Sequence, residues 1–214
     1  SLHKLQEQLQ QHNIQLEIRP NQQFLIDHQT FLEKYKKPPV METFYRWMRK
    51  ETRILMDWDQ PAWGQRNYDK ENRKFDKDFV DADHLVFDAT PERKEALDYH
   101  QQDVAKRGKE VINYLPTTTQ QAHDLLHHFL DHHLERFGEL EDAMYSTSHF
   151  VHHSLLSIPI NFWLLTPQEV IEAVEQADAP INSKEGFIRQ VLGWREYMYH
   201  RFHHYKDDIY KQNK

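Results

Sequence analysis

Histidine is the residue type that first suggests chemistry, since the 214 residues include 16 His. Five lie in one predicted helix: His123, His127, His128, His132 and His133. Side chains four residues apart share a helix face, so 123/127 and 128/132 could bind zinc or nickel, with Asp124 or Asp131 as a further ligand. A solvated helix explains the pattern better, because neither pair has a third ligand at a fixed spacing. The same two interpretations apply to His200, His203 and His204.

A second candidate is a short turn in which two serines bracket two leucines. It comprises His153, Ser154, Leu155, Leu156 and Ser157, followed by Pro159. Serine hydroxyls and free backbone N–H groups at a helix start can hold a phosphate, while the leucines anchor the turn in the core. The alternative is an apolar helix over residues 149–157 whose serines bond their own backbone carbonyls.

A third candidate is one face of the last predicted helix. Gly186 and Gly193 lie seven residues apart there, beside an apolar stripe of Phe187, Val191, Trp194 and Met198. Glycine in a helix costs about 1 kcal/mol relative to alanine, so two on one face predict something packed close to the backbone. Either another helix or a flat ring system would fit.

Composition excludes several classes of protein. The sequence has no Cys, so it supplies no disulfide, no thiolate metal site and no ligand for an iron–sulfur cluster. It also lacks paired catalytic carboxylates, a Ser-His-Asp order and the GxSxG, Walker A, GxGxxG and HExxH motifs. No apolar run approaches the roughly 20 residues of a membrane span, and no signal peptide is recognisable, so we expect a cytoplasmic protein. The net charge of -7 disfavours a nucleic-acid binder, although the charge is unevenly distributed.

The elements that position these candidates are mainly helices. We expect helices over residues 2–9, 27–35 and 41–56, with one short strand over residues 14–18 and a long loop over residues 57–88. Capping patterns then predict helix starts at Thr90-Pro91, at Thr118 with Gln121, at Thr166 with Glu169 and at Asn182 with Glu185. One strand cannot form a sheet, so we expect it to be the tail of an α/β domain.

Several of these segments together resemble the photolyase/cryptochrome superfamily, and more narrowly the bacterial iron–sulfur (6-4) photolyases. The resemblance rests on residues 153–157, on Asn161 with Leu164-Leu165-Thr166-Pro167, and on residues 185–190 and 193–197. Upstream it includes Phe44-Tyr45-Arg46, Asn67-Tyr68-Asp69 and Leu115-Pro116-Thr117-Thr118. It implies a flavoprotein that uses light to repair UV-damaged DNA, with FAD in a helical domain, a lumazine antenna in an α/β domain and a four-cysteine [4Fe–4S] cluster.

The resemblance also assigns roles to particular residues. It implies that His153, Ser154, Leu155, Leu156 and Ser157 form the turn that holds the FAD phosphates, with Gln190 and Arg195 near the flavin and Trp194 on the lesion side. We expect residues 41–75, with Arg46 and Arg49, to face DNA or the domain interface, the alternative being a solvated helix and connector. Four positions depart from the superfamily: Val191 replaces a carboxylate, Ile158 a proline, Trp163 a glycine and Arg66 an aromatic residue.

The resemblance predicts a mainly α chain. Residues 1–75 would be the end of the α/β (Rossmann-like) antenna domain, residues 76–89 a linker and residues 90–214 the start of the helical FAD domain. We expect a middle fragment that contributes part of the FAD site and lacks the antenna and cluster ligands. An exposed apolar face that includes Phe187, Val191 and Trp194 would lead either to self-association or to a loose last helix. The alternatives are a non-catalytic helical interaction module and a His-rich metal-binding helical protein.

Overall fold

The computed structural model describes residues 2–17, 21–71, 83–103, 114–146, 148 and 150–212. The helices within these residues are α1 (Leu2–Gln10), α2 (His28–Lys34), α3 (Met41–Thr52), α4 (Pro91–Asp103), α5 (Thr119–His132), α6 (Leu134–Leu140), α7 (Ser157–Asn161), α8 (Pro167–Gln176), α9 (Ile181–Ile188) and α10 (Glu196–Gln212). Short 3-10 turns span Ala62–Gly64 and Asp69–Glu71. The described residues contain one sheet, an antiparallel pair of β1 (Met56–Asp57) and β2 (Gln60–Pro61). The prediction of a mainly helical chain is confirmed.

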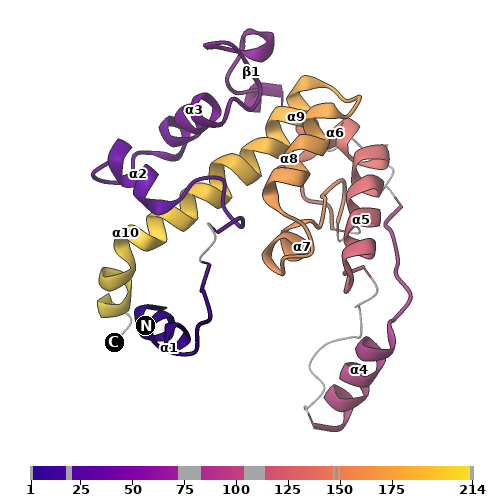
Figure 1. Cartoon of the computed structure of the whole chain (residues 1–214). Coiled ribbons are helices and arrows are strands. Elements are labelled where there is room, and N and C mark those ends of the chain that lie inside the picture. The colour runs from indigo at the N-terminus through magenta and orange to yellow at the C-terminus, as the bar shows by residue number, and fades with distance from the viewer. Residues whose placement is uncertain are drawn as a thin grey trace.

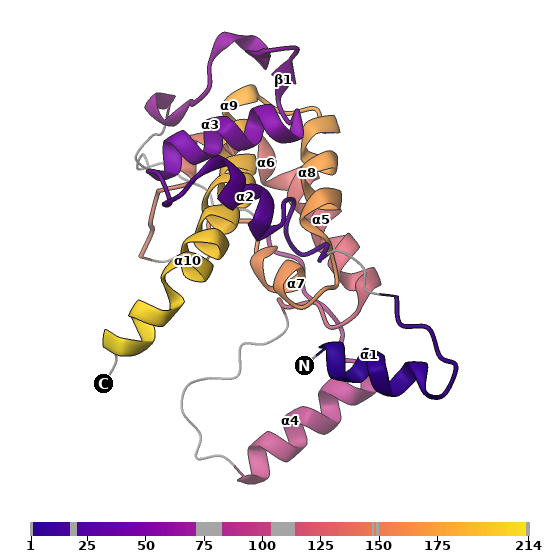
Figure 2. The same ribbon diagram turned by 60° about the vertical axis from the view of Figure 1, so that its left-hand side comes forward.

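One nearly continuous helical rod organises the core. Helix α9 passes through a π-helical segment, η3 (Arg189–Arg195), directly into α10. In Figure 1 this rod crosses the molecule, with α2 and α3 along one side and α5, α6 and α8 along the other. Figure 2 shows that the end of α10 and helix α4 project from the body. The apolar cluster around the rod includes residues from α2, α3, α5, α8 and α9, such as Phe31, Phe44, Phe129, Ile171 and Ile188.

Most of the predicted helix starts are confirmed by their caps. The Thr118 side chain accepts a hydrogen bond from the Gln121 backbone N–H at 3.2 Å. Thr166 and Glu169 form a reciprocal capping box at the start of α8, and Pro91 opens α4. The predicted cap at Asn182 is wrong, because α9 already begins at Ile181 after Pro180 and has no side-chain cap. Proline fixes φ near the helical value and prepares that start without a cap.

Two predicted elements are not formed. Residues 14–17 lie in no strand, while residue 18 lies outside the described part; without a neighbouring strand the alternating pattern has no hydrogen-bonding partner. The helix expected over residues 149–157 is also wrong: residues 150–156 are turns, and only α7 is helical. Val151 and Leu155 adopt left-handed φ angles of 52° and 58°, which a right-handed helix does not accommodate.

The Rossmann-like tail is therefore not seen in the described residues. The boundary at residues 76–89 stays a prediction, since residues 72–82 lie outside the described part. Within the described residues, no helix has the length and apolar character needed to cross a membrane.

A close helix–helix approach fixes α6 against α9. A Cβ placed on Gly138 of α6 would lie 2.4 Å from the Asn182 carbonyl carbon and 2.5 Å from the Ser183 nitrogen. The Gly138 N–H donates to Ser183 Oγ at 2.9 Å, and that hydroxyl donates to the Glu135 carbonyl at 2.9 Å. Because the close atoms belong to the backbone of α9, a side-chain rearrangement could not make room for a Cβ at residue 138.

We predict that Gly138→Ala lowers the free energy of unfolding by about 1–3 kcal/mol, as expected for overpacking against backbone. Urea unfolding followed by circular dichroism measures this change. Gly193→Ala is the matched control, because its Cβ would meet only side-chain atoms at 3.4 Å and helix propensity favours alanine. Equal destabilisation by both substitutions would contradict the assignment.

Candidate functional site

The predicted phosphate turn is an irregular loop that leads into α7. Ser154 Oγ accepts a hydrogen bond from the Leu156 N–H at 3.2 Å, and His153 Nε2 lies 3.0 Å from the Glu141 carbonyl oxygen. Leu156 is buried and anchors the turn, as expected, whereas Ser157 is exposed at the start of α7. The turn therefore presents the exposed hydroxyl of Ser157, whereas the hydroxyl of Ser154 organises the loop.

A backbone constraint marks the exit from α7. Trp163 has a φ of 63°, in the left-handed region, and its side chain is 58% exposed. Glycine adopts this conformation freely, and the resemblance expects glycine at this position. The tryptophan costs about 1–2 kcal/mol in backbone strain, which burial of its indole does not offset.

Arg195 connects the N-terminal segment to the helical rod. Its guanidinium donates to the backbone carbonyl of Gln23, and to Gln23 Oε1 at 2.8 Å, and it lies 4.4 Å from the centre of the Phe24 ring. Its Nε is 3.4 Å from Asn161 Oδ1 at the end of α7. Burial lowers the pKa of Arg195. The structure thus brings Arg195 to the phosphate turn's helix, but most of its donors already bond protein groups.

Gln190 belongs to a buried ionic network. Its side-chain nitrogen donates to Glu141 Oε2 at 3.2 Å and to the Gly186 carbonyl at 3.2 Å. Glu141 Oε1 accepts from Arg189 Nη2 at 2.8 Å, and Arg189 Nε donates to Glu185 Oε1 at 3.2 Å. Burial raises the pKa of Glu185 despite the nearby guanidinium. Gln190 therefore supports helix packing in this structure.

The glycine face of the rod contacts protein rather than presenting an open slot. A Cβ on Gly193 would meet Met41 and Tyr45 of α3, and one on Gly186 would meet the Glu141 carboxylate. Helix α3 therefore lies against Gly193, at distances that leave room for a Cβ. Phe187 and Val191 are buried, so of these three residues only Trp194 is exposed, at 44%, beside Met198 of the same stripe.

The two arginines predicted to face DNA differ in their placement. Arg46 is exposed on α3 and pairs with Glu42 at 2.7 Å. Arg49 is buried, and its guanidinium donates to the Arg66 carbonyl at 3.0 Å and to the Leu55 carbonyl. This corrects the expectation for Arg49, which in this conformation organises the loop after α3 and has no surface for DNA.

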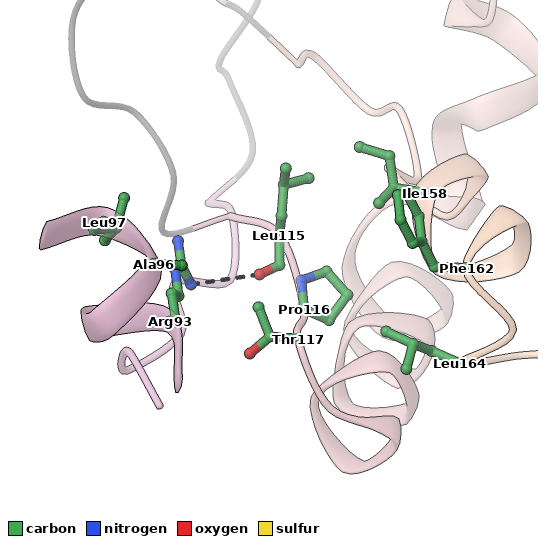
Figure 3. A pocket seen from close by; sticks show the side chains of 9 residues that line it. All are labelled: Arg93, Ala96, Leu97, Leu115, Pro116, Thr117, Ile158, Phe162 and Leu164. Atoms are coloured by element: carbon green, nitrogen blue, oxygen red, sulfur yellow. Dashed lines mark hydrogen bonds between the residues drawn. The ribbon is translucent and has the colours of Figure 1, made fainter. Parts of the chain in front are cut away.

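A mostly apolar pocket of about 560 Å³ borders α7. In Figure 3, Ile158, Phe162 and Leu164 face it from the α7 side and Arg93, Ala96 and Leu97 from α4, with residues 115–117 between them. The Arg93 guanidinium reaches the Leu115 carbonyl at 3.5 Å. The volume lies in the range of small-molecule sites, and the pocket adjoins the residue after Ser157.

Several of the described histidines lie close together around His133. His133 is buried and stacks on His84, with His128 and His152 nearby. Burial, followed by the neighbouring imidazoles, lowers the pKa of His133 to about 3. Across the described ranges, no group of three or more His, Cys, Asp or Glu side chains could hold a metal ion. The metal-binding alternative therefore finds no support in the geometry.

A buried acid–histidine pair on α10 was missed by the sequence reasoning. Glu196 Oε1 accepts from the Leu25 N–H at 2.9 Å, and Glu196 Oε2 lies 3.9 Å from His200 Nε2. His200 stacks on Phe31, and its Nδ1 lies 3.2 Å from His28 Nδ1. Burial raises the pKa of Glu196 to about 7 and lowers the pKa of His200 to about 4. Their spacing of four residues, opposite the Trp194 and Met198 stripe, was the available signal.

Comparison with known proteins identifies the class as photolyase-related. A family model described as deoxyribodipyrimidine photo-lyase-related protein matches residues 1–111, more than half of the chain. The chain is also 38% identical over 193 residues to a (6-4) photolyase of Agrobacterium fabrum, an overlap of 86% of this chain and 38% of the relative. The chain belongs to the deoxyribodipyrimidine photo-lyase-related family. It spans well under half of the length of this relative.

We predict that Glu196→Gln raises the free energy of unfolding more at pH 8 than at pH 5. The folded state raises the pKa of Glu196 from 4.5 to about 7, so the carboxyl group's contribution to stability is present below pH 4.5 and is lost as pH rises to 7. Across this pH range, the difference in free energy of unfolding between the variant and the original protein should change by an amount on the order of 3 kcal/mol.

Urea unfolding of both proteins at each pH measures the effect. His200 is present in both proteins, so its own contribution to stability largely cancels when they are compared. That contribution has the opposite pH dependence, because it is lost as pH falls from 6.5 toward 4. Glu135→Gln, on the exposed surface of α6, should show no such pH dependence. A Glu196→Gln effect that is equal at the two pH values would contradict burial of an ionisable carboxyl group.

Proposed function

We propose that this protein takes part in light-dependent repair of UV-damaged DNA as a photolyase-type flavoprotein. The observation that carries the proposal is membership of the photolyase-related family, together with the extended match to a protein named as a (6-4) photolyase. The substrate would be a pyrimidine photoproduct in DNA, and we propose a cytoplasmic location. Which photoproduct is used stays open between the (6-4) product and the cyclobutane dimer.

The donor set of the phosphate turn suits the phosphates of FAD. Ser157 is exposed, Ser154 is partly exposed, and Arg195 reaches Asn161 at the end of the same short helix. The neighbouring apolar pocket could take part of a ring system. When bound and reduced, FAD supplies the electron that light transfers to the lesion. The side chains of this chain would hold its phosphates and keep the adjoining surface apolar.

The remaining assignments follow the family likeness. We propose that Gln190 and Arg195 lie on the flavin side, Trp194 on the lesion side, and Arg46 near a DNA phosphate. Gln190 and Arg195 would have to exchange present hydrogen bonds for contacts with the flavin. The chain has no Cys and can supply no thiolate ligand for a [4Fe–4S] cluster. No antenna contact is proposed for it.

We predict that this chain alone binds FAD with millimolar affinity or weaker. A charge-assisted phosphate contact contributes about 1.5–3 kcal/mol, and immobilising the ligand costs more than this. Titration of FAD with detection by flavin fluorescence tests the prediction, with Ser157→Ala as a variant that should weaken binding further. Saturable quenching at low micromolar FAD with 1:1 stoichiometry would show that a complete site is present.

We predict that Arg46→Glu weakens binding of this chain to DNA and reduces the slope of log affinity against log salt by about 1. Arg46 is exposed on α3, so the change reverses a charge without opening the core. Anisotropy titrations of labelled DNA at several salt concentrations measure it. Arg136→Glu changes the net charge equally from the exposed surface of α6 and should leave the slope unchanged. Equal changes in DNA affinity and salt slope for the two variants would contradict a phosphate contact by Arg46.

A further inference from the structure

The hairpin after α3 presents two tryptophans to solvent. Trp58 is 87% exposed and Trp63 is 63% exposed, although burial of an indole is among the largest apolar contributions a side chain can make. Trp58 lies in the two-residue turn between β1 and β2, and Trp63 lies in the 3-10 turn that follows β2. Figures 1 and 2 show β1 at the periphery of the molecule.

Both tryptophans also occupy unfavourable backbone conformations. Trp58 has a φ of 51° at the first position of the hairpin turn, where glycine is the usual residue in one favoured turn type. Trp63 has a φ of 60° and is followed by Gly64 with a φ of 82°. Left-handed φ is costly for a bulky side chain, and these indoles gain little from burial in return. Strain retained at exposed residues suggests a function for those side chains.

Buried polar contacts hold the base of the hairpin in place. The guanidinium of Arg49 bonds the carbonyls of Leu55 and Arg66, which lie on either side of the hairpin. The Leu55 N–H donates to Glu175 Oε1 on α8 at 2.7 Å. The hairpin is thereby attached to the helical body through two separate elements.

The tryptophans' own carbonyls are held as well. Arg53 Nη1 donates to the Trp58 carbonyl at 2.8 Å, and the Tyr68 hydroxyl donates to the Trp63 carbonyl at 3.3 Å. A ring held on a fixed backbone loses less conformational entropy on binding than one on a mobile loop. The hairpin therefore presents two preorganised aromatic surfaces.

The surroundings of these indoles favour a flat polar-edged ligand over a protein partner. Exposed polar side chains flank them at Asp57, Asp59, Gln60 and Gln65. A protein interface normally has a contiguous apolar centre, which these separated rings do not form. A nucleobase offers an apolar face for stacking and polar edges for the neighbouring groups, and aromatic stacking of this kind tolerates any base.

We propose that Trp58 and Trp63 form a stacking surface for unpaired bases of single-stranded or locally opened DNA. This inference rests on the proposed function, because DNA is its substrate. The net charge is -7, and the exposed arginines nearby already pair, Arg46 with Glu42 and Arg53 with Asp59. Stacking would therefore supply most of the affinity, and the salt dependence of binding would be small and limited to a contact such as the one proposed for Arg46. In paired duplex DNA the base faces are already stacked and unavailable.

The test compares this chain with the double variant Trp58→Ala/Trp63→Ala in anisotropy titrations of a labelled oligothymidylate and of a matched duplex. We expect the chain to prefer the single strand, and the double variant to lose tenfold or more of that affinity, as expected for loss of one or two stacked bases. Trp58→Phe/Trp63→Phe should retain most of it. Tyr210→Ala removes an exposed aromatic ring of α10 and should have no effect. Thermal unfolding of each variant checks that the fold is intact.

Unchanged single-strand affinity in the alanine double variant would overturn the stacking surface and leave the proposed function standing. A loss in that variant, with no preference of the intact chain for UV-irradiated over untreated strands, would support the surface and count against the repair function. Failure of the intact chain to bind either DNA would overturn both.

Discussion

The buried guanidinium of Arg189 is the interaction on which the arrangement of the candidate site depends. It lies between Glu141, in the loop after α6, and Glu185, on α9, with both carboxylates almost completely buried. Burial of these carboxyl groups is costly, and burial raises the pKa of Glu185 even though the guanidinium groups of Arg189 and Arg49 act in the opposite direction. The Gln190 amide and the Tyr68 N–H reduce this cost by donating to Glu141 and Glu185. Removing one partner of such a network is strongly destabilising, by about 3–5 kcal/mol.

The same network positions the predicted phosphate turn, residues 153–157. The Glu141 backbone carbonyl contacts the His153 ring, while its carboxylate faces Gly186 and bonds Arg189 and Gln190. One residue therefore connects the turn to the helical rod. The glycine at 186 is explained by this carboxylate, whereas a Cβ at 193 would make only ordinary contacts with its neighbours. A flat ring is not needed to account for Gly186.

The sequence predicted those features of the fold that depend only on residues close together in the chain, such as helix caps. The caps at Thr118 and Thr166 were predictable because each involves a side chain and a backbone N–H three residues away. The break at Val151 and Leu155 was not, because tertiary packing imposes left-handed φ on residues with no preference for it. The pairing of Glu196 with His200 was not predicted for a similar reason: their pKa shifts come from burial against residues 25–31, more than 160 positions away in the sequence. The strand predicted at residues 14–17 was wrong because alternation of apolar and polar residues favours a strand only where a neighbouring strand is available to pair with it.

The placement of the arginines links the fold to the way in which this chain could recognise a ligand. Arg49 and Arg195 were expected to meet DNA and flavin, yet the first bonds the carbonyls of Leu55 and Arg66, and the second bonds Gln23. A guanidinium can satisfy several carbonyl groups at once, which makes it well suited to joining segments distant in the sequence. Guanidinium groups used in this way attract phosphate only if they exchange these contacts, and the chain is acidic overall. Apart from the exposed Arg46, recognition by its surface would then rest mainly on hydroxyl groups and aromatic faces, which are the groups found at the turn before α7 and at the hairpin after α3.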